Sequence, residues 1–135
     1  KPAIDVGQIE GGFIQGMGWL TTEDLQWNAA GELTSFGPAT YKIPAIGDTP
    51  AEFNVHLFDS ENPEFTVFRS KAVGEPPFML ANSVWCALCD AIASITDYRH
   101  APVLDTPATP ERILSAVIAA QQWQANTTKE AAHVE

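Results

Sequence analysis

The chain has 135 residues, of which 45% are hydrophobic and 10% aromatic, and its formal net charge is −10. This size and composition fit one modest folded domain and argue against a disordered chain. The strong negative charge and the seven scattered Lys and Arg residues exclude a nucleic-acid-binding surface. We find no apolar run long enough to cross a bilayer and no signal-peptide pattern, so we expect no membrane partner.

Residues 6–25 carry apolar side chains at helical spacing, interrupted by glycines. Val6, Ile9, Phe13 and Met17 recur every three or four residues, which predicts a helix. Each glycine inside a helix costs up to about 1 kcal/mol relative to alanine. A helix with that cost lets either a neighbouring helix or a ligand approach closely, and the residues alone leave both alternatives open. The glycines concerned are Gly11, Gly12, Gly16 and Gly18.

The middle of the chain shows short strand patterns separated by turns. Residues 28–32, Asn-Ala-Ala-Gly-Glu, predict a turn with a short strand on either side. Farther along, apolar residues alternate with polar ones, which is typical of a strand. The predicted strands are residues 26–27, 33–35, 53–57 and 65–68.

Two further helices follow. Residues 77–98 carry one continuous apolar stripe, which is more typical of a protein core than of a cofactor pocket. Thr109-Pro110-Glu111 combines an N-cap residue, a first-turn proline and an early acid, so a helix begins there. The chain turns polar after Trp123, and we expect residues 125–135 to be a frayed tail. The predicted fold is therefore α+β, one unit over residues 1–124 with short antiparallel strands and about three helices.

Cys86 and Cys89 have Cys-x-x-Cys spacing inside the predicted helix at residues 77–98. Two thiols supply only half of a tetrahedral zinc site, and the three histidines are dispersed, so we predict no metal-ligating residues. A position inside the helix favours packing residues over a redox pair. Free cysteines also fit a reducing, cytoplasmic location.

Glu75 stands between Gly74 and two prolines, directly before the predicted helix. Proline fixes its own φ and is favoured at the start of a helix, and glycine permits unusual backbone angles and close approach. We therefore expect Glu75 at a rigid strand-to-helix corner, a placement that suits a general base. Taken alone, the spacing also fits a surface carboxylate stabilised by the positive end of a helix.

Four motifs occur together along residues 5–117. They are VGQIEGGFIQGMG at residues 6–18, YKIP at 41–44, KAVGEPP at 71–77 and PATPER at 107–112. In this order and at about this spacing they resemble the xanthine dehydrogenase/aldehyde oxidase family of molybdenum hydroxylases. The resemblance is to the C-terminal part of the family's molybdenum-binding subunit, and it is strongest to the bacterial xanthine dehydrogenase branch. It favours the catalytic reading of Glu75 over the surface one.

The resemblance implies a chemistry and a set of site residues. Members of the family insert a water-derived oxygen into an electron-poor carbon, so the position of Glu75 in KAVGEPP implies that it is the general base. The position of Gln8 implies a contact with the pterin of the molybdenum–molybdopterin cofactor, and Lys71 and Gly74 are further candidate cofactor-binding residues. The favoured substrate is xanthine or hypoxanthine, and an aldehyde or another N-heterocycle is the alternative.

The resemblance also implies partners. We expect the chain to be the last portion of a larger molybdenum subunit, and to contact the remainder of that subunit and an iron–sulfur/flavin subunit. Iron–sulfur clusters and FAD are then held elsewhere in the holoenzyme, and the isolated chain is expected to be inactive. A non-catalytic assembly module, which keeps these segments only to fold against a partner, is the alternative reading.

Overall fold

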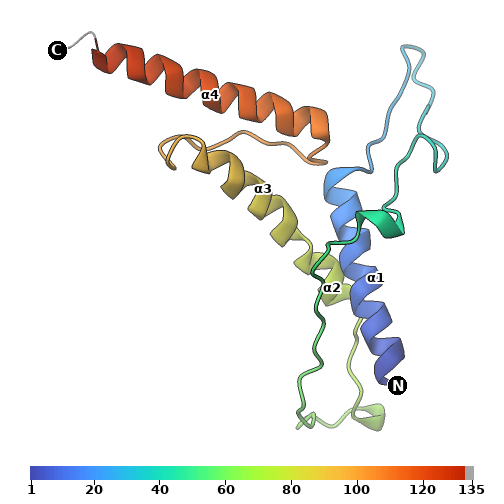
Figure 1. Cartoon of the computed structure of the whole chain (residues 1–135). Coiled ribbons are helices and arrows are strands. Elements are labelled where there is room, and N and C mark those ends of the chain that lie inside the picture. The colour runs from blue at the N-terminus through green and yellow to red at the C-terminus, as the bar shows by residue number, and fades with distance from the viewer. Residues whose placement is uncertain (133–135) are drawn as a thin grey trace.

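The computed structural model describes residues 1–132, whose regular structure is helical. The helices are α1 (Pro2–Thr21), α2 (Glu75–Leu80), α3 (Asn82–Ser94) and α4 (Pro110–Ala132), with 3-10 turns η1 (Ile46–Asp48) and η2 (Val67–Arg69). Figure 1 shows α1 beside α2, α3 leading away from this pair, and α4 packed across the far end of α3. The α1–α2 contact is the part of this arrangement that positions the candidate site.

The predicted α+β class is wrong, because no β-strand forms within residues 1–132. An isolated antiparallel bridge joins Trp27 to Leu33, around a turn in which Asn28 Oδ1 accepts hydrogen bonds from the backbone N–H groups of Ala30 and Glu32. The predicted turn is therefore present, but the pairing does not extend into a ladder. A pair of short segments without a third strand or a covering helix is only marginally stable.

The predicted strands at residues 53–57 and 65–68 are also absent from the structure. Phe68 and Arg69 have φ values of 52° and 54°, in the left-handed region that is incompatible with a strand. Side chains of this segment extend into solvent: Phe58 is 91%, Phe65 104% and Phe68 97% exposed. The alternation of apolar and polar residues in this segment therefore indicates side chains suited to a half-buried surface. The part of the chain that the structure describes contains no strand with which the segment could pair.

The helix predicted from residue 6 onward is confirmed as α1, and two of its glycines explain how α2 packs on it. A Cβ atom on Gly12 would lie 3.1 Å from the carbonyl oxygen of Gly74. A Cβ atom on Gly16 would overlap the carbonyl oxygen of Phe78 and lie 2.6 Å from the Cβ atom of Ala81. Of the two alternatives left open by the sequence, close helix packing therefore accounts for Gly12 and Gly16.

The long predicted helix at residues 77–98 is divided into α2 and α3. Ala81, which is fully buried, links the two with φ −61° and ψ −13°. Together they form an apolar stretch, Glu75–Ser94, that by length and composition alone could cross a membrane. The expectation that no apolar run is long enough to cross a bilayer is therefore wrong for this stretch. The core helix of a soluble protein passes the same test, so the finding carries no functional argument.

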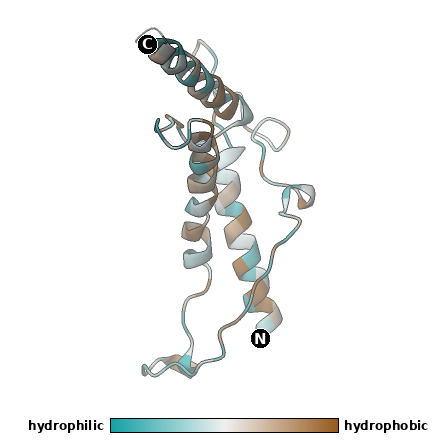
Figure 2. Ribbon diagram, turned by 60° about the vertical axis from the view of Figure 1, so that its left-hand side comes forward, coloured by the Kyte–Doolittle hydropathy of each residue, from teal (hydrophilic) through white to brown (hydrophobic). Residues whose placement is uncertain are grey.

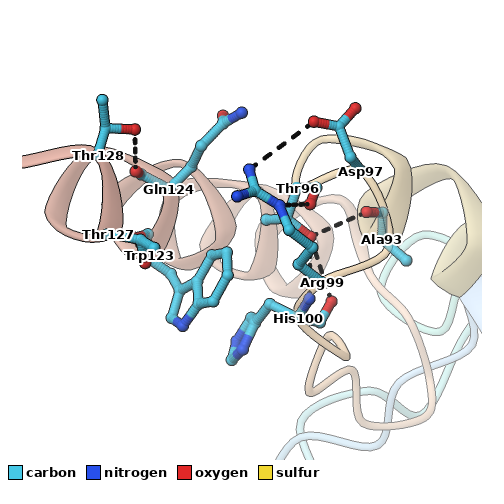
Figure 3. Close-up of polar contacts among 9 residues, drawn as sticks. All are labelled: Ala93, Thr96, Asp97, Arg99, His100, Trp123, Gln124, Thr127 and Thr128. Atoms are coloured by element: carbon cyan, nitrogen blue, oxygen red, sulfur yellow. Dashed lines mark hydrogen bonds and ion pairs between the residues drawn. The ribbon is translucent and has the colours of Figure 1, made fainter. Parts of the chain in front are cut away.

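α4 packs on α3 through a small core and is anchored by one aromatic group. The buried members of the core are Ile92, Leu104, Ala108, Ala116 and Ala120. Farther along α4, the Trp123 ring stacks on His100 with 5.1 Å between ring centroids, and the Arg99 guanidinium lies 5.8 Å from the Trp123 ring (Figure 3). This contact joins the loop after α3 to the second half of α4.

The predicted start of α4 is confirmed at Pro110, but its end differs from the prediction. The helix continues to Ala132, so the expected frayed tail is helical over residues 125–132, and residues 133–135 lie outside the described part of the chain. Thr127 and Thr128 donate hydroxyl hydrogen bonds to the carbonyls of Trp123 and Gln124, one turn earlier. Figure 2 shows this end of α4 as hydrophilic and its beginning as hydrophobic, so the polar end continues as a solvated helix.

Candidate active site between α1 and α2

An open cleft of about 830 Å³ lies where α1 meets the start of α2. This volume is within the range of small-molecule binding sites in proteins. Its lining residues are Gln8, Gly11, Gly12, Gln15, Gly74, Glu75, Phe78 and Met79. Three of the four predicted site residues, Gln8, Gly74 and Glu75, are therefore brought to one place by segments more than sixty residues apart in the sequence.

One face of α1 forms the first wall of the cleft. Gln8, Gly11, Gly12 and Gln15 are spaced i, i+3, i+4 and i+7, so they share one side of the helix. Two carboxamides therefore flank two residues that have no side chain. A Cβ atom on Gly11 would meet nothing within 4 Å, so this part of the wall is open to whatever enters the cleft.

Glu75 is the first residue of α2 and faces the cleft from the opposite wall. Pro76 and Pro77 follow it, and they lack N–H groups at positions where a helix has no internal acceptor for them. Pro77 is buried against α1, where its Cβ atom would lie 3.4 Å from a Cβ atom on Gly12. The backbone at Glu75 is therefore held by proline geometry and by direct packing, while its carboxylate is exposed to the cleft.

Gly74 lines the cleft, but its backbone does not adopt the unusual angles that the sequence context predicts for this glycine. Its φ of −79° is accessible to any residue, and a Cβ atom there would meet nothing within 4 Å. The backbone at this position therefore does not require glycine. A glycine here keeps the space beside Glu75 free, while the close helix contacts belong to Gly12 and Gly16.

Phe78 and Met79 complete the wall on the α2 side with apolar surface. The Phe78 ring packs against Trp19 of α1, with 5.4 Å between the ring centroids. This contact fixes the side of α2 that follows Glu75. The cleft thus combines a carboxylate and two amides with one apolar wall, a composition common in small-molecule sites.

The structure does not bring Lys71 to the cleft. Lys71 is exposed in the irregular segment before α2 and is absent from the lining residues. Conversely, Gln15 was not predicted as a site residue, yet it lines the cleft together with Gln8. The signal was available, because Gln15 lies seven residues after Gln8 within a segment predicted to be helical.

Cys89 and Tyr41, whose pKa values are raised, do not line the cleft. Cys86 is exposed and Cys89 half-buried on α3, and burial, assisted by the charge of the neighbouring Cys86, raises the pKa of the Cys89 thiol. A raised pKa lowers the thiolate fraction, which favours the packing interpretation over a redox pair. In the irregular segment after α1, a hydrogen bond with Glu23, together with burial and the charge of Glu23, raises the pKa of Tyr41.

The cleft residues fit an organic heterocycle better than a bare metal ion. Within residues 1–132 no group of three or more His, Cys, Asp or Glu side chains is placed to hold a metal. By contrast, the carboxamides of Gln8 and Gln15 can each donate and accept hydrogen bonds, and Gly11 between them leaves room for a flat ring. This donor set matches the pterin part of a molybdenum–molybdopterin cofactor, whose own sulfur atoms rather than protein side chains would hold the metal.

Comparison with known proteins identifies the family of the chain. A sequence profile described as a molybdopterin cofactor-binding domain matches residues 1–50, which include the α1 wall of the cleft. Xanthine dehydrogenase/oxidase from Mus musculus is 45% identical over 124 residues, covering 87% of this chain and 9% of the relative. Aldehyde oxidase 2 from Macaca fascicularis is 48% identical over 119 residues, covering 86% of this chain and 9% of the relative.

A plant relative shows the same pattern: xanthine dehydrogenase 1 from Arabidopsis thaliana is 47% identical over 129 residues, covering 86% of this chain. The chain spans only 9% of the length of each of these relatives. The identity extends over most of this chain and is therefore not confined to one motif. The chain therefore belongs to the xanthine dehydrogenase/aldehyde oxidase family of molybdenum hydroxylases and corresponds to a C-terminal part of it.

Proposed function

We propose that this chain supplies the general base and part of the cofactor-binding site of a molybdenum hydroxylase that oxidises xanthine or hypoxanthine. The observation that carries the proposal is the shared cleft: Glu75 of α2 faces the same space as Gln8 and two glycines of α1. A carboxylate fixed by two prolines beside the Gln8 amide is the arrangement that a positioned base next to a bound heterocycle requires.

The cofactor and the protein divide the chemistry between them. When bound, the molybdenum cofactor would supply a water-derived oxygen and take up the hydrogen of the substrate C–H bond together with its two electrons. Glu75 accepts the proton of that oxygen on one of its carboxylate oxygens as the new carbon–oxygen bond forms. Gln8 donates and accepts hydrogen bonds at the pterin edge, and so orients the cofactor relative to Glu75.

The proposed substrate is a purine, and the alternative is an aldehyde. The sequence identity of this chain to relatives named xanthine dehydrogenase is close to its identity to a relative named aldehyde oxidase. Sequence identity alone therefore does not distinguish between the two substrates. The sequence SKAVGEPPFMLA and the PATPER motif favour the purine-oxidising branch. In the same proposal, iron–sulfur clusters and FAD accept the electrons elsewhere in the holoenzyme.

The exposed apolar side chains support an assembly role in addition to catalysis. Phe58, Phe65 and Phe68 are more than nine-tenths exposed, and such a surface on one segment is typical of an interface. We therefore propose that residues 53–69 fold against the remainder of the molybdenum subunit, which completes the active site. This role accounts for the expected inactivity of the isolated chain.

The test is turnover of the full-length enzyme carrying Glu75→Gln, normalised to bound molybdenum, with xanthine and with benzaldehyde as substrates. Removing a positioned base is expected to lower turnover of the true substrate about 10²–10⁴-fold while molybdenum is retained. Glu10→Gln is the matched control, because Glu10 also lies near Gln8 on α1 but does not line the cleft. A loss below tenfold at equal molybdenum content contradicts the base assignment. Wild-type turnover of benzaldehyde but not of xanthine contradicts the purine assignment alone.

A further inference from the structure

The second carboxamide of the cleft, that of Gln15, has no role in the function proposed above. Gln15 is exposed on α1 and lines the cleft with Phe78 and Met79. The side-chain hydrogen bonds of α1 lie at its two ends, between the Lys1 amino group and Asp5 and between Thr21 and the carbonyl of Met17. Within residues 1–132 the Gln15 amide is therefore available to a bound molecule.

The direction of the helices places Gln15 on the side of Glu75 opposite to Gln8. Gly12 packs near Gly74 and Pro77, and Gly16 packs near Phe78 and Ala81, so α1 and α2 advance in the same direction along their contact. Gln8 precedes this contact, and Gln15 lies beside its Phe78 end. Seven residues of helix separate the two amides by about 10 Å along the axis. One amide therefore lies on each side of the region that Glu75 faces.

The surroundings of Gln15 define what it can recognise. Phe78 and Met79 offer an apolar wall beside a group that can donate and accept at once. A flat heterocycle packs its ring on such a wall and presents an N–H and a carbonyl or ring nitrogen along one edge. A carboxamide pairs with that edge through two hydrogen bonds, whereas a plain aldehyde offers only an acceptor.

We infer that Gln15 orients the bound molecule by pairing with the donor–acceptor edge of a heterocycle beside Glu75. This inference rests on the proposed function, and it adds a positioning residue to it. Both the pterin of the cofactor and a purine substrate carry such an edge. The chemistry of recognition is the same for either source, and the experiment separates the two.

The test uses the full-length enzyme with Gln15→Met, which keeps the length and helix preference of the side chain but removes both hydrogen bonds. Three quantities are measured: pterin and molybdenum content per protein, KM and kcat for xanthine, and KM and kcat for benzaldehyde. Gln122→Met is the matched control, because Gln122 is an exposed glutamine of α4 outside the cleft. Cofactor content is read without turnover, so failure of the inference is distinguishable from failure of the base assignment.

Two results support the inference. If Gln15 pairs with the pterin, Gln15→Met lowers pterin and molybdenum content together, about tenfold for loss of two hydrogen bonds at equal cofactor supply. If it pairs with the substrate, content is unchanged and KM for xanthine rises about tenfold while KM for benzaldehyde stays constant. The inference is overturned if Gln15→Met matches Gln122→Met in all three measurements. It is equally overturned if turnover of both substrates falls in parallel at unchanged content and KM, because that marks a general structural effect.

Discussion

The α1–α2 contact makes the position of Glu75 depend on a glycine that does not line the cleft. Gly16 is buried, and a Cβ atom there would lie 2.6 Å from the Cβ atom of Ala81 and overlap the carbonyl oxygen of Phe78. Carbon atoms in contact are normally about 3.5–4.0 Å apart. Gly16→Ala therefore forces α2 away from α1 by about 1 Å, and Glu75, three residues before Phe78 on the same helix, moves with it.

The energies indicate that this variant folds but works poorly. Overpacking costs about 1–3 kcal/mol, and replacing a helical glycine by alanine returns up to about 1 kcal/mol. The net loss of about 0–2 kcal/mol is small against the stability of a folded domain. In contrast, a displacement of about 1 Å at a catalytic group can cost about 10²-fold in rate. We therefore expect turnover, rather than folding, to report the change.

The assay is xanthine turnover per bound molybdenum in the full-length enzyme, for wild type, Gly16→Ala and Gly7→Ala. Gly7 is a matched control on the same helix, since a Cβ atom there would meet nothing within 4 Å. We expect Gly16→Ala to lose about 10²-fold and Gly7→Ala to match the wild type. Wild-type turnover by Gly16→Ala at equal molybdenum content would refute the link between this helix contact and catalysis.

Three further predictions concern regions outside the cleft. The hydrogen bond with Glu23 raises the pKa of Tyr41 above its ordinary value of 10.0. The stabilisation of the folded state by this contact is therefore complete below pH 10 and is lost as the pH rises through the raised pKa. Glu23→Gln should shift the ultraviolet titration of the Tyr41 phenol to lower pH, and an unchanged titration would contradict the assignment. Trp123→Leu removes the stacking of Trp123 on His100, which is worth about 0.5–1.5 kcal/mol. Amide hydrogen exchange in the second half of α4 should then become about 2–10-fold faster. Unchanged exchange would show that this contact does not stabilise that part of the helix. Burial raises the pKa of Cys89, so this thiol should react with iodoacetamide at neutral pH more slowly than a free cysteine peptide, and faster reaction would restore the redox reading.

Most of the correct predictions about the fold came from the helical spacing of apolar residues. The apolar spacing of α1 and the Thr109-Pro110-Glu111 signal identified both helices because these patterns depend on residues close in the chain. The four predicted strands failed for the opposite reason. A strand exists only with a partner, and within residues 1–132 the nearest approach to one is the single bridge at Trp27 and Leu33.

Residues of the candidate site could be predicted where a sequence motif identified both the residue and the helix on which it lies. Glu75 and Gln8 were assigned from motifs, and the structure brings them into one cleft. Lys71 was assigned from the same motif, but its exposed position before α2 depends on how an irregular segment folds, which no local pattern determines. Gln15 was missed because its significance lies in the packing of α2 on α1, a contact between distant segments.

The most direct test of the account is the single-turnover rate with xanthine for Glu75→Gln against the wild type, in molybdenum-loaded full-length enzyme. A single turnover isolates the chemical step from product release, so under the proposed function the rate reports the proton transfer assigned to Glu75. The account predicts a rate about 10²–10⁴-fold lower in Glu75→Gln, with molybdenum and pterin content unchanged. A rate within a few-fold of the wild type would contradict it, because a cleft that hydroxylates xanthine without this carboxylate has its base elsewhere.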